Sequence, residues 1–222
     1  MFSKVLLAED IDSINIAVVN TLDELNIIEK DSVKYCDDAL LKIKKALQDE
    51  KPYQLLLTDL SFKEDFRQNT LNSGEELIIA IKQLQPTIKV IVLSVEEKTY
   101  RIKSLFEHLH IDAFVLKGRN SMPELKKAIQ HVFDGNTNYI APNLSFILKD
   151  KMIHEIDNYD IQLIEQLSYG IAQEKMDIKF KELGVEPNSK STIEKRIGKL
   201  KDYFKANNTV HLIAIAKDLG LI

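Results

Sequence analysis

Acidic, hydroxyl and ammonium side chains stand at the ends of short apolar runs in the first part of the chain. In chain order they are Glu9 and Asp10, Asp59, Ser94 and Lys117. Three carboxylates that share one crevice repel each other unless a cation lies among them, and such oxygen-rich groups suit Mg²⁺. A lysine and a hydroxyl at the same place can hold an anionic group during its transfer. The set therefore predicts phosphoryl transfer to a carboxylate, with Asp59 as the nucleophile.

Alternating apolar patterns predict the elements that bring these side chains together. Runs of strand length lie at 4–8, 32–36, 54–60, 89–94 and 113–116. Segments with helical periodicity lie between and after them, at 14–25, 39–47, 76–84, 100–109 and 124–133. Runs that are apolar at every position indicate strands covered on both faces, as in a parallel sheet. We therefore expect an α/β fold with a flavodoxin-like, doubly wound, five-stranded parallel sheet that binds ligands beyond the carboxyl ends of its strands.

Each of these polar residues also has an ordinary structural explanation. An aspartate at the end of a strand is often the N-cap of the next helix, and a lysine in that position is usually solvated. The occurrence of all of them at strand ends of one predicted sheet favours a common site over separate structural roles.

The segments that carry these residues resemble the receiver domains of two-component response regulators. The resemblance extends from Lys4 to about Phe133 and rests on Leu6-Leu7-Ala8-Glu9-Asp10, Leu56-Leu57-Thr58-Asp59-Leu60, Ile91-Val92-Leu93-Ser94 and Phe114-Val115-Leu116-Lys117. It implies that a sensor histidine kinase phosphorylates Asp59. It further implies that Glu9, Asp10, Asp59 and the backbone carbonyl of Ser61 bind Mg²⁺.

The same resemblance assigns the remaining site residues. Lys117 and Ser94 would hold the phosphoryl group, and Ser94 and Phe114 match the hydroxyl and aromatic positions that shift together when it arrives. A plain core aromatic is the alternative for Phe114. We expect a signalling protein rather than an enzyme, because the C-terminal part of the sequence has no glycine-rich phosphate loop and no histidines and cysteines at metal-binding spacing. Slow hydrolysis of the acyl phosphate is still expected of the receiver.

Two features depart from the pattern of that family. The connection 60–73 is several residues longer than the usual one, and Gly118 follows Lys117 where many relatives have proline. A tolerated surface insertion explains the long connection, and a loop that shields the site or contacts a partner is the alternative.

The pattern divides the chain into a receiver domain at 1–135, a linker at 136–157 and an all-helical domain at 158–222. Within the last domain, Ser191-Thr192-Ile193-Glu194 forms a predicted capping box for a helix that runs to about Phe204. Between 189 and 205 six basic residues oppose two acidic ones. We expect this helix to contact DNA through Lys190, Thr192, Lys195, Arg196, Lys199 and Lys201. An ordinary solvated basic face is the alternative.

The helical domain is similar to the LuxR-type (NarL/FixJ-like) helix-turn-helix. The similarity rests on residues 191–197 and on the closing segment 211–222, whereas 170–191 is longer than the usual scaffold and turn. It implies a transcription factor that binds double-stranded DNA as a homodimer after phosphorylation. A receiver whose last helices bind protein or RNA is the alternative.

Composition agrees with a globular protein and excludes several classes. Hydrophobic residues make up 45% of the 222 residues, and no window approaches the roughly 20 uncharged apolar residues that a membrane span needs. We therefore expect a cytoplasmic protein without a membrane partner. The single cysteine, Cys36, is interpreted as a buried structural thiol. The helical domain has neither a glycine-rich phosphate loop nor histidines and cysteines at metal-binding spacing.

Overall fold

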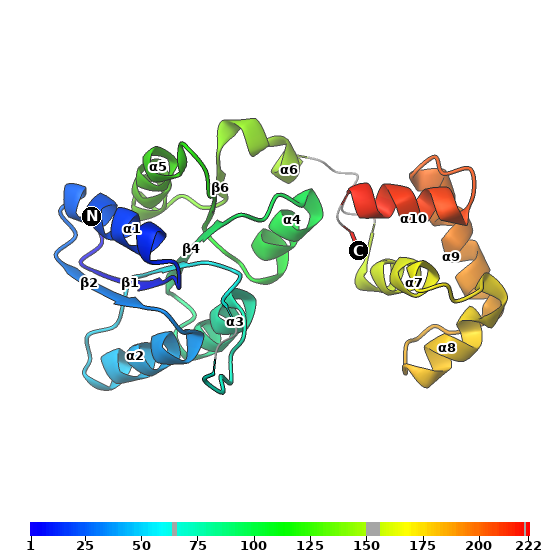
Figure 1. Ribbon diagram of the computed structural model, residues 1–222, viewed down its shortest axis with the longest axis horizontal. Coiled ribbons are helices and arrows are strands. Elements are labelled where there is room, and N and C mark those ends of the chain that lie inside the picture. Colours follow the sequence, from blue (N-terminus) through cyan, green and yellow to red (C-terminus); the bar gives the residue numbers. More distant parts are fainter. Residues whose placement is uncertain (64–65, 150–155, 220) are drawn as a thin grey trace. The chain divides into compact units, whose positions relative to one another are not determined.

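The computed structural model describes residues 1–63, 66–149, 156–219 and 221–222 (Figure 1). Internal contacts divide them into two compact units. One is built around Met1–Glu97 and Ile102–Phe146, and the other around Ile147–Ile222. The predicted boundaries at 135 and 157 remain a prediction, since part of the predicted linker, 150–155, lies outside the described residues.

The first unit is a parallel sheet between helices. Its strands are β1 (Lys4–Ala8), β2 (Glu29–Val33), β3 (Leu55–Thr58), β4 (Lys89–Ser94), β5 (Ala113–Leu116) and β6 (Tyr139–Ile140). They lie in the order β2-β1-β3-β4-β5-β6, and all neighbours are parallel. This confirms the predicted doubly wound fold. The short sixth strand, which was expected to be linker, extends the sheet beside β5.

Five helices connect the strands of this sheet. They are α1 (Asp12–Glu24), α2 (Cys36–Gln48), α3 (Gly74–Leu84), α4 (Thr99–His108) and α5 (Ser121–Phe133). α1 and α5 cover one face together, and α2 and α3 pack side by side on the other (Figure 1). Burial of β1, β3 and β4 on both faces explains their uninterrupted apolar sequences.

The position of the second strand differs from the prediction. The apolar run at 32–36 suggested it, but β2 begins at Glu29 and ends at Val33. β2 is an edge strand, and only Val33 among its residues is buried, so its sequence is largely polar. Cys36 instead begins α2, where burial of its side chain agrees with the predicted structural role.

The second unit is helical. It contains α7 (Asn158–Ser168), a 3₁₀ turn η3 (Gln173–Lys175), α8 (Met176–Glu182), α9 (Lys190–Tyr203) and α10 (Thr209–Asp218). Between the sheet and α7 the described chain also forms η1 (Pro142–Leu144) and α6 (Phe146–Lys149). Each long helix contributes one apolar stripe to a shared core, with Ile164, Phe180, Ile197 and Leu212 among its members.

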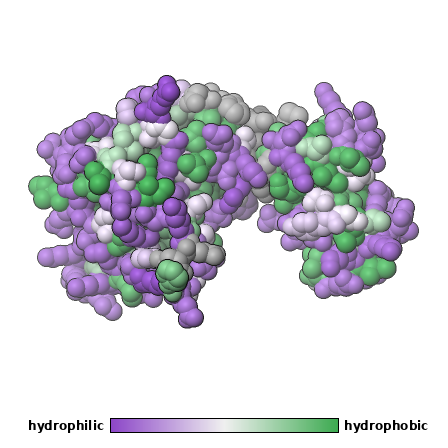
Figure 2. Space-filling view, in the orientation of Figure 1, coloured by the Kyte–Doolittle hydropathy of each residue, from purple (hydrophilic) through white to green (hydrophobic). Residues whose placement is uncertain are grey.

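The outer surface is mainly hydrophilic on the face that Figure 2 shows, with hydrophobic residues in scattered patches. Among the described residues, no helix combines the length and the apolar character required to cross a membrane.

Candidate functional site

Strand register brings the predicted site residues to one edge of the sheet. Ala8 of β1 pairs with Thr58 of β3, so Glu9 and Asp59 leave the sheet side by side. Ser94 is the last residue of β4 and pairs with Leu116, directly before Lys117. The carboxyl ends of neighbouring parallel strands necessarily share an edge, which is why the sequence pattern could predict this convergence.

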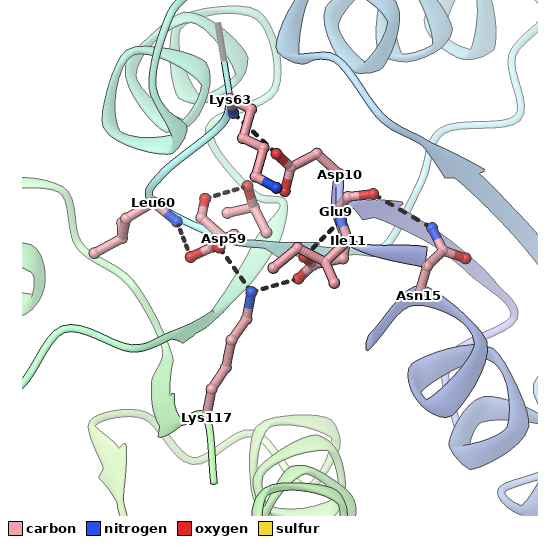
Figure 3. A network of polar contacts seen from close by, with 9 residues as sticks. Glu9, Asp10, Ile11, Asn15, Asp59, Leu60, Lys63 and Lys117 are labelled. Carbon is pink, nitrogen blue, oxygen red and sulfur yellow. Dashed lines mark hydrogen bonds and ion pairs between the residues drawn. The ribbon is translucent and has the colours of Figure 1, made fainter. Parts of the chain in front are cut away.

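Lys117 connects two of the carboxylates (Figure 3). Its Nζ lies 2.7 Å from Asp59 Oδ2 and 2.8 Å from Glu9 Oε2. The three side chains are only 6%, 5% and 1% exposed, respectively. Water therefore screens these charges weakly, and the lysine is the cation that allows two carboxylates to be buried together.

The carboxylates also meet the requirements of a divalent cation site. One oxygen each from Glu9, Asp10 and Asp59 lies within 4.8 Å of the others. Although Lys117 is close, Glu9 Oε2 receives no well-directed hydrogen bond from the described residues. A buried oxygen without a directed donor, next to two more carboxylates, suits a hard cation such as Mg²⁺.

Burial and ion pairing change the proton affinities in this cluster. Burial raises the pKa of the Glu9 carboxyl above its usual range, although Lys117 opposes that change. Burial also disfavours the charged form of Lys117, but its hydrogen bond to Asp59 and its attraction to the Asp59 and Glu9 carboxylates outweigh this effect and raise the pKa of the lysine. Lys117 is therefore fully charged near neutral pH.

The backbone holds Asp59 rigidly at the end of β3. The Leu60 amide donates to Asp59 Oδ1 at 2.6 Å, and the Thr58 hydroxyl donates to the Asp59 carbonyl at 2.8 Å. Gly74, the first residue of α3, approaches so closely that a Cβ there would lie 1.9 Å from the Asp59 carbonyl oxygen. Only glycine fits at this position.

The other predicted site residues occupy the same region. Ser94 is buried, and its carbonyl accepts a hydrogen bond from the Lys117 amide at 2.8 Å. Phe114 is fully buried within β5, opposite Val92 of β4. Ser61 follows Leu60 and forms an antiparallel bridge with Ser73. Their roles in metal binding and switching remain predictions.

The long connection after β3 is attached to α2 and to the acidic cluster. The Lys63 amide donates to Asp10 Oδ2 at 2.9 Å (Figure 3). Arg67 makes a forked ion pair with Asp38, at 2.9 and 2.6 Å. The amides of residues 70 and 71 both donate to Asp37. These contacts could not be predicted from the sequence, because their partners lie more than 25 positions apart and three of the donors are backbone amides. Residues 64 and 65 lie outside the described part of the loop.

The basic helix α9 begins two residues earlier than the predicted capping box implied. Its N-cap is Ser189, whose hydroxyl accepts a hydrogen bond from the Thr192 amide at 3.2 Å. The prediction of Ser191 as the cap was therefore wrong. Both serines precede the apolar stripe, and Ser189 is the one that follows the break at 187–188 and has extended backbone angles.

The side chains predicted to contact DNA differ in how far they are exposed to solvent. Lys190, Lys195 and Lys199 are exposed on α9, and Thr192 and Lys201 are half-buried. Arg196 is different because its guanidinium turns toward the start of α7.

Arg196 forms an ion-pair cluster with the α7 N-terminus. Its Nε lies 2.5 Å from Asp160 Oδ1 and a terminal nitrogen lies 3.0 Å from Oδ2. The same guanidinium pairs with Asp157, the N-cap of α7. Asp160 is 2% exposed, and burial raises its pKa although Arg196 opposes the change. Arg196 is thus engaged in an ion pair within the helical unit, and its predicted contact with DNA stays a prediction. The Asp157-x-x-Asp160 spacing before an apolar run was the available signal for the capping box there.

Solved structures of the response regulator RcsB are similar to this chain. An RcsB–DNA complex is 19% identical, with 96% of each chain covered and a TM-score of 0.63. RcsB from Salmonella typhimurium is 18% identical, with 97% of this chain and 98% of that chain covered and a TM-score of 0.58. The isolated REC domain of RcsB from Salmonella enterica serovar Typhimurium, with the phosphomimetic BeF3−, is 21% identical. The match with this domain covers 66% of the present chain and 98% of the REC-domain chain, with a TM-score of 0.53.

At these identities the likeness shows a common fold, an α/β receiver-type unit followed by a helical unit. No family model matches the sequence, and no curated protein matches it.

Proposed function

We propose that this protein is a two-component response regulator that accepts a phosphoryl group on Asp59 and binds DNA through α9. The contact of Lys117 with both Asp59 and Glu9 carries the proposal. A buried lysine between a metal-type carboxylate and a strand-end aspartate provides the positive charge that a phosphorylated Asp59 requires.

The proposed reaction uses the groups that surround Asp59. The carboxylate attacks the phosphorus of a phosphohistidine, a P–O bond to Asp59 forms, and the P–N bond breaks as the imidazole leaves. Mg²⁺ held by Glu9, Asp10, Asp59 and the carbonyl of Ser61 would neutralise charge on the phosphoryl oxygens. Lys117 follows the anion from the carboxylate to the phosphoryl group, and the Ser94 hydroxyl donates to a phosphoryl oxygen. The Leu60 amide keeps Asp59 oriented during attack.

The proposed output is DNA binding controlled by this modification. Movement of Ser94 toward the phosphoryl group would leave space for Phe114 to shift and would bias the receiver toward a second conformation. That conformation forms a homodimer, so two copies of α9 read two half-sites. The exposed Lys190, Lys195 and Lys199 support the proposed contacts with phosphates. The RcsB structures with DNA give independent support through the shared fold.

Intact-mass measurement tests the acceptor. The protein is incubated with Mg²⁺ and a small acyl-phosphate donor, and we expect the added mass of one phosphoryl group. Asp59→Ala should abolish the addition, and Asp49→Ala, which removes an exposed aspartate from the end of α2, should retain it. Addition that persists in Asp59→Ala, or none in the native protein with several donors, would refute the assignment.

Selection from a random pool of double-stranded DNA, with and without phosphodonor, tests the output. We expect enrichment of a sequence with two half-sites, stronger after phosphorylation. Equal retention of single-stranded RNA in a competition experiment would favour the RNA-binding alternative. Loss of binding in Lys195→Ala/Lys199→Ala, with Lys175→Ala as a matched exposed control, would assign it to α9.

A further inference from the structure

The loop between β3 and α3 is attached firmly to the start of α2, outside the cluster of Glu9, Asp10 and Asp59. Arg67 and Asp38 form a two-pronged ion pair, and the guanidinium also lies 4.5 Å from the centre of the Tyr35 ring. Asp37, the neighbouring residue of α2, accepts the amides of Thr70 at 2.7 Å and Leu71 at 3.2 Å. These bonds fix the second half of the loop to the first turn of α2.

The base of the same loop is closed beside Asp59. Ser61 and Ser73 form an antiparallel bridge, and the Gly74 amide donates to the Leu60 carbonyl at 2.9 Å. Both ends of the loop are therefore fixed, at the base by the bridge and on its far side by α2. In the sequence, Lys63 therefore lies between two attached points, the Ser61–Ser73 bridge and residues 67–71.

Within this closed loop, the Lys63 amide reaches across to the cluster. It donates to Asp10 Oδ2 at 2.9 Å, while Asp10 still contributes one carboxylate oxygen to the group with Glu9 and Asp59. A hydrogen bond to one oxygen of a ligating carboxylate orients the other toward the metal, and such outer bonds affect affinity strongly. Asp10 is only half-buried, so packing alone does not fix its rotamer.

We infer that the attachment of the loop to α2 positions Asp10 for the divalent cation, with Arg67 and Asp38 as positioning residues remote from the ligands. The inference rests on the proposed Mg²⁺ site and deepens it. The long connection then belongs to the phosphoryl-acceptor machinery, which goes beyond the surface insertion expected from sequence.

Charge provides a way to separate positioning from general electrostatics. Removal of Arg67 takes a positive charge away from the acidic cluster, which by Coulomb attraction alone would strengthen cation binding. If Arg67 instead acts by positioning Asp10, its removal should weaken cation binding. Arg67→Lys keeps the charge but cannot reproduce the planar two-pronged bond, so it should give an intermediate result.

The test combines calorimetric titration with Mg²⁺ and amide hydrogen exchange on the full chain. We expect Arg67→Ala to weaken Mg²⁺ binding about 10-fold and to speed exchange at residues 70 and 71. Lys44→Ala removes the charge of an exposed α2 lysine and should change neither quantity by more than about twofold.

Two results would overturn the inference. One is faster exchange at 70 and 71 in Arg67→Ala with Mg²⁺ binding unchanged or tighter. The other is unchanged exchange, which would mean that Arg67 does not hold the loop. Absence of measurable Mg²⁺ binding by the native protein would instead refute the metal site itself. Exchange in Arg67→Ala would still report whether the loop is attached, so the two failures are distinguishable.

Discussion

At the edge of the sheet and on the basic helix α9, the sequence predicted in each case that a set of charged side chains shares one site, and the two outcomes differ. At the edge, residues more than 100 positions apart meet as predicted, and Lys117 lies between Glu9 and Asp59. On α9, two residues that are adjacent in the sequence have different surroundings, since Lys195 is exposed and Arg196 pairs with Asp160. Parallel strands force their ends to one edge whatever the side chains are. A helix offers several faces, and the surrounding helices decide which face is exposed.

Both regions contain a cation that compensates buried carboxylates. Lys117 serves two acceptors that are almost fully buried, whereas Arg196 is itself 28% exposed and serves one buried and one exposed aspartate. The comparison predicts that loss of the cation costs more at the sheet edge than in the helical unit.

Lys117→Met tests the larger cost. We expect the free energy of unfolding to fall by about 3 kcal/mol at pH 7, because Glu9 and Asp59 remain buried without a cation. In that variant at least one carboxyl takes a raised folded-state pKa, so the folded state binds more protons than the unfolded state. The deficit should therefore shrink as the pH falls below 7. Denaturant titrations at two pH values measure it.

The control is Lys117→Met introduced into a chain that already carries Asp59→Asn. With one carboxylate neutralised, Lys117→Met should cost clearly less than in the native chain. Equal costs in both backgrounds would show that the lysine does not compensate Asp59.

Arg196→Ala tests the smaller cost. The change leaves Asp160 buried without its partner, and we expect the helical unit to lose about 2 kcal/mol of stability, less than a fully buried pair. Lys195→Ala, one residue away and exposed, should change it by less than about 0.5 kcal/mol. Hydrogen exchange of amides in α7 and α9 measures both. Equal effects would mean that the ion pair contributes nothing.

Salt dependence of DNA binding sharpens the distinction within α9. Each phosphate contact contributes about 0.9 to the slope of log K against log salt concentration. Lys195→Ala/Lys199→Ala should therefore reduce the slope by nearly 2, and Arg196→Ala should leave it unchanged even where affinity falls. A reduced slope in Arg196→Ala would show that Arg196 contacts a phosphate despite its ion pair with Asp160.

A partly exposed pair in the first unit sets the lower limit of the comparison. Burial favours the protonated form of Asp31, but hydrogen bonds from Lys42 and Tyr53 outweigh it and lower its pKa. After discounting for solvent screening, we expect Asp31→Asn to cost less than about 1 kcal/mol at pH 7. A carboxyl whose pKa is lower in the folded state than in the unfolded state stabilises the fold at pH values above its unfolded-state pKa. The difference from native should therefore begin to shrink below about pH 4 and should vanish only when the pH lies below the lowered folded-state pKa, in thermal unfolding at several pH values.

The sequence was sufficient wherever topology controls the outcome. Apolar runs predicted β1, β3, β4 and β5, and the residues at their ends formed the candidate site. It was insufficient where exposure hides a pattern, as in the polar edge strand β2. It was also insufficient where a backbone amide is the partner, because the bond from Lys63 to Asp10 depends on loop conformation and not on the Lys63 side chain.

The contacts that join the end of β3 to Gly74 at the start of α3 also affect how this protein can change over evolutionary time. The Leu60 carbonyl, the Gly74 amide and the Ser61–Ser73 bridge join β3 directly to α3. Asp59 is thereby held by groups outside the intervening segment, so that segment can gain or lose residues without displacing Asp59 itself. Exchange of this loop would therefore leave Asp59 in place but would replace the amide that contacts Asp10, so the surroundings of these two carboxylates can vary independently.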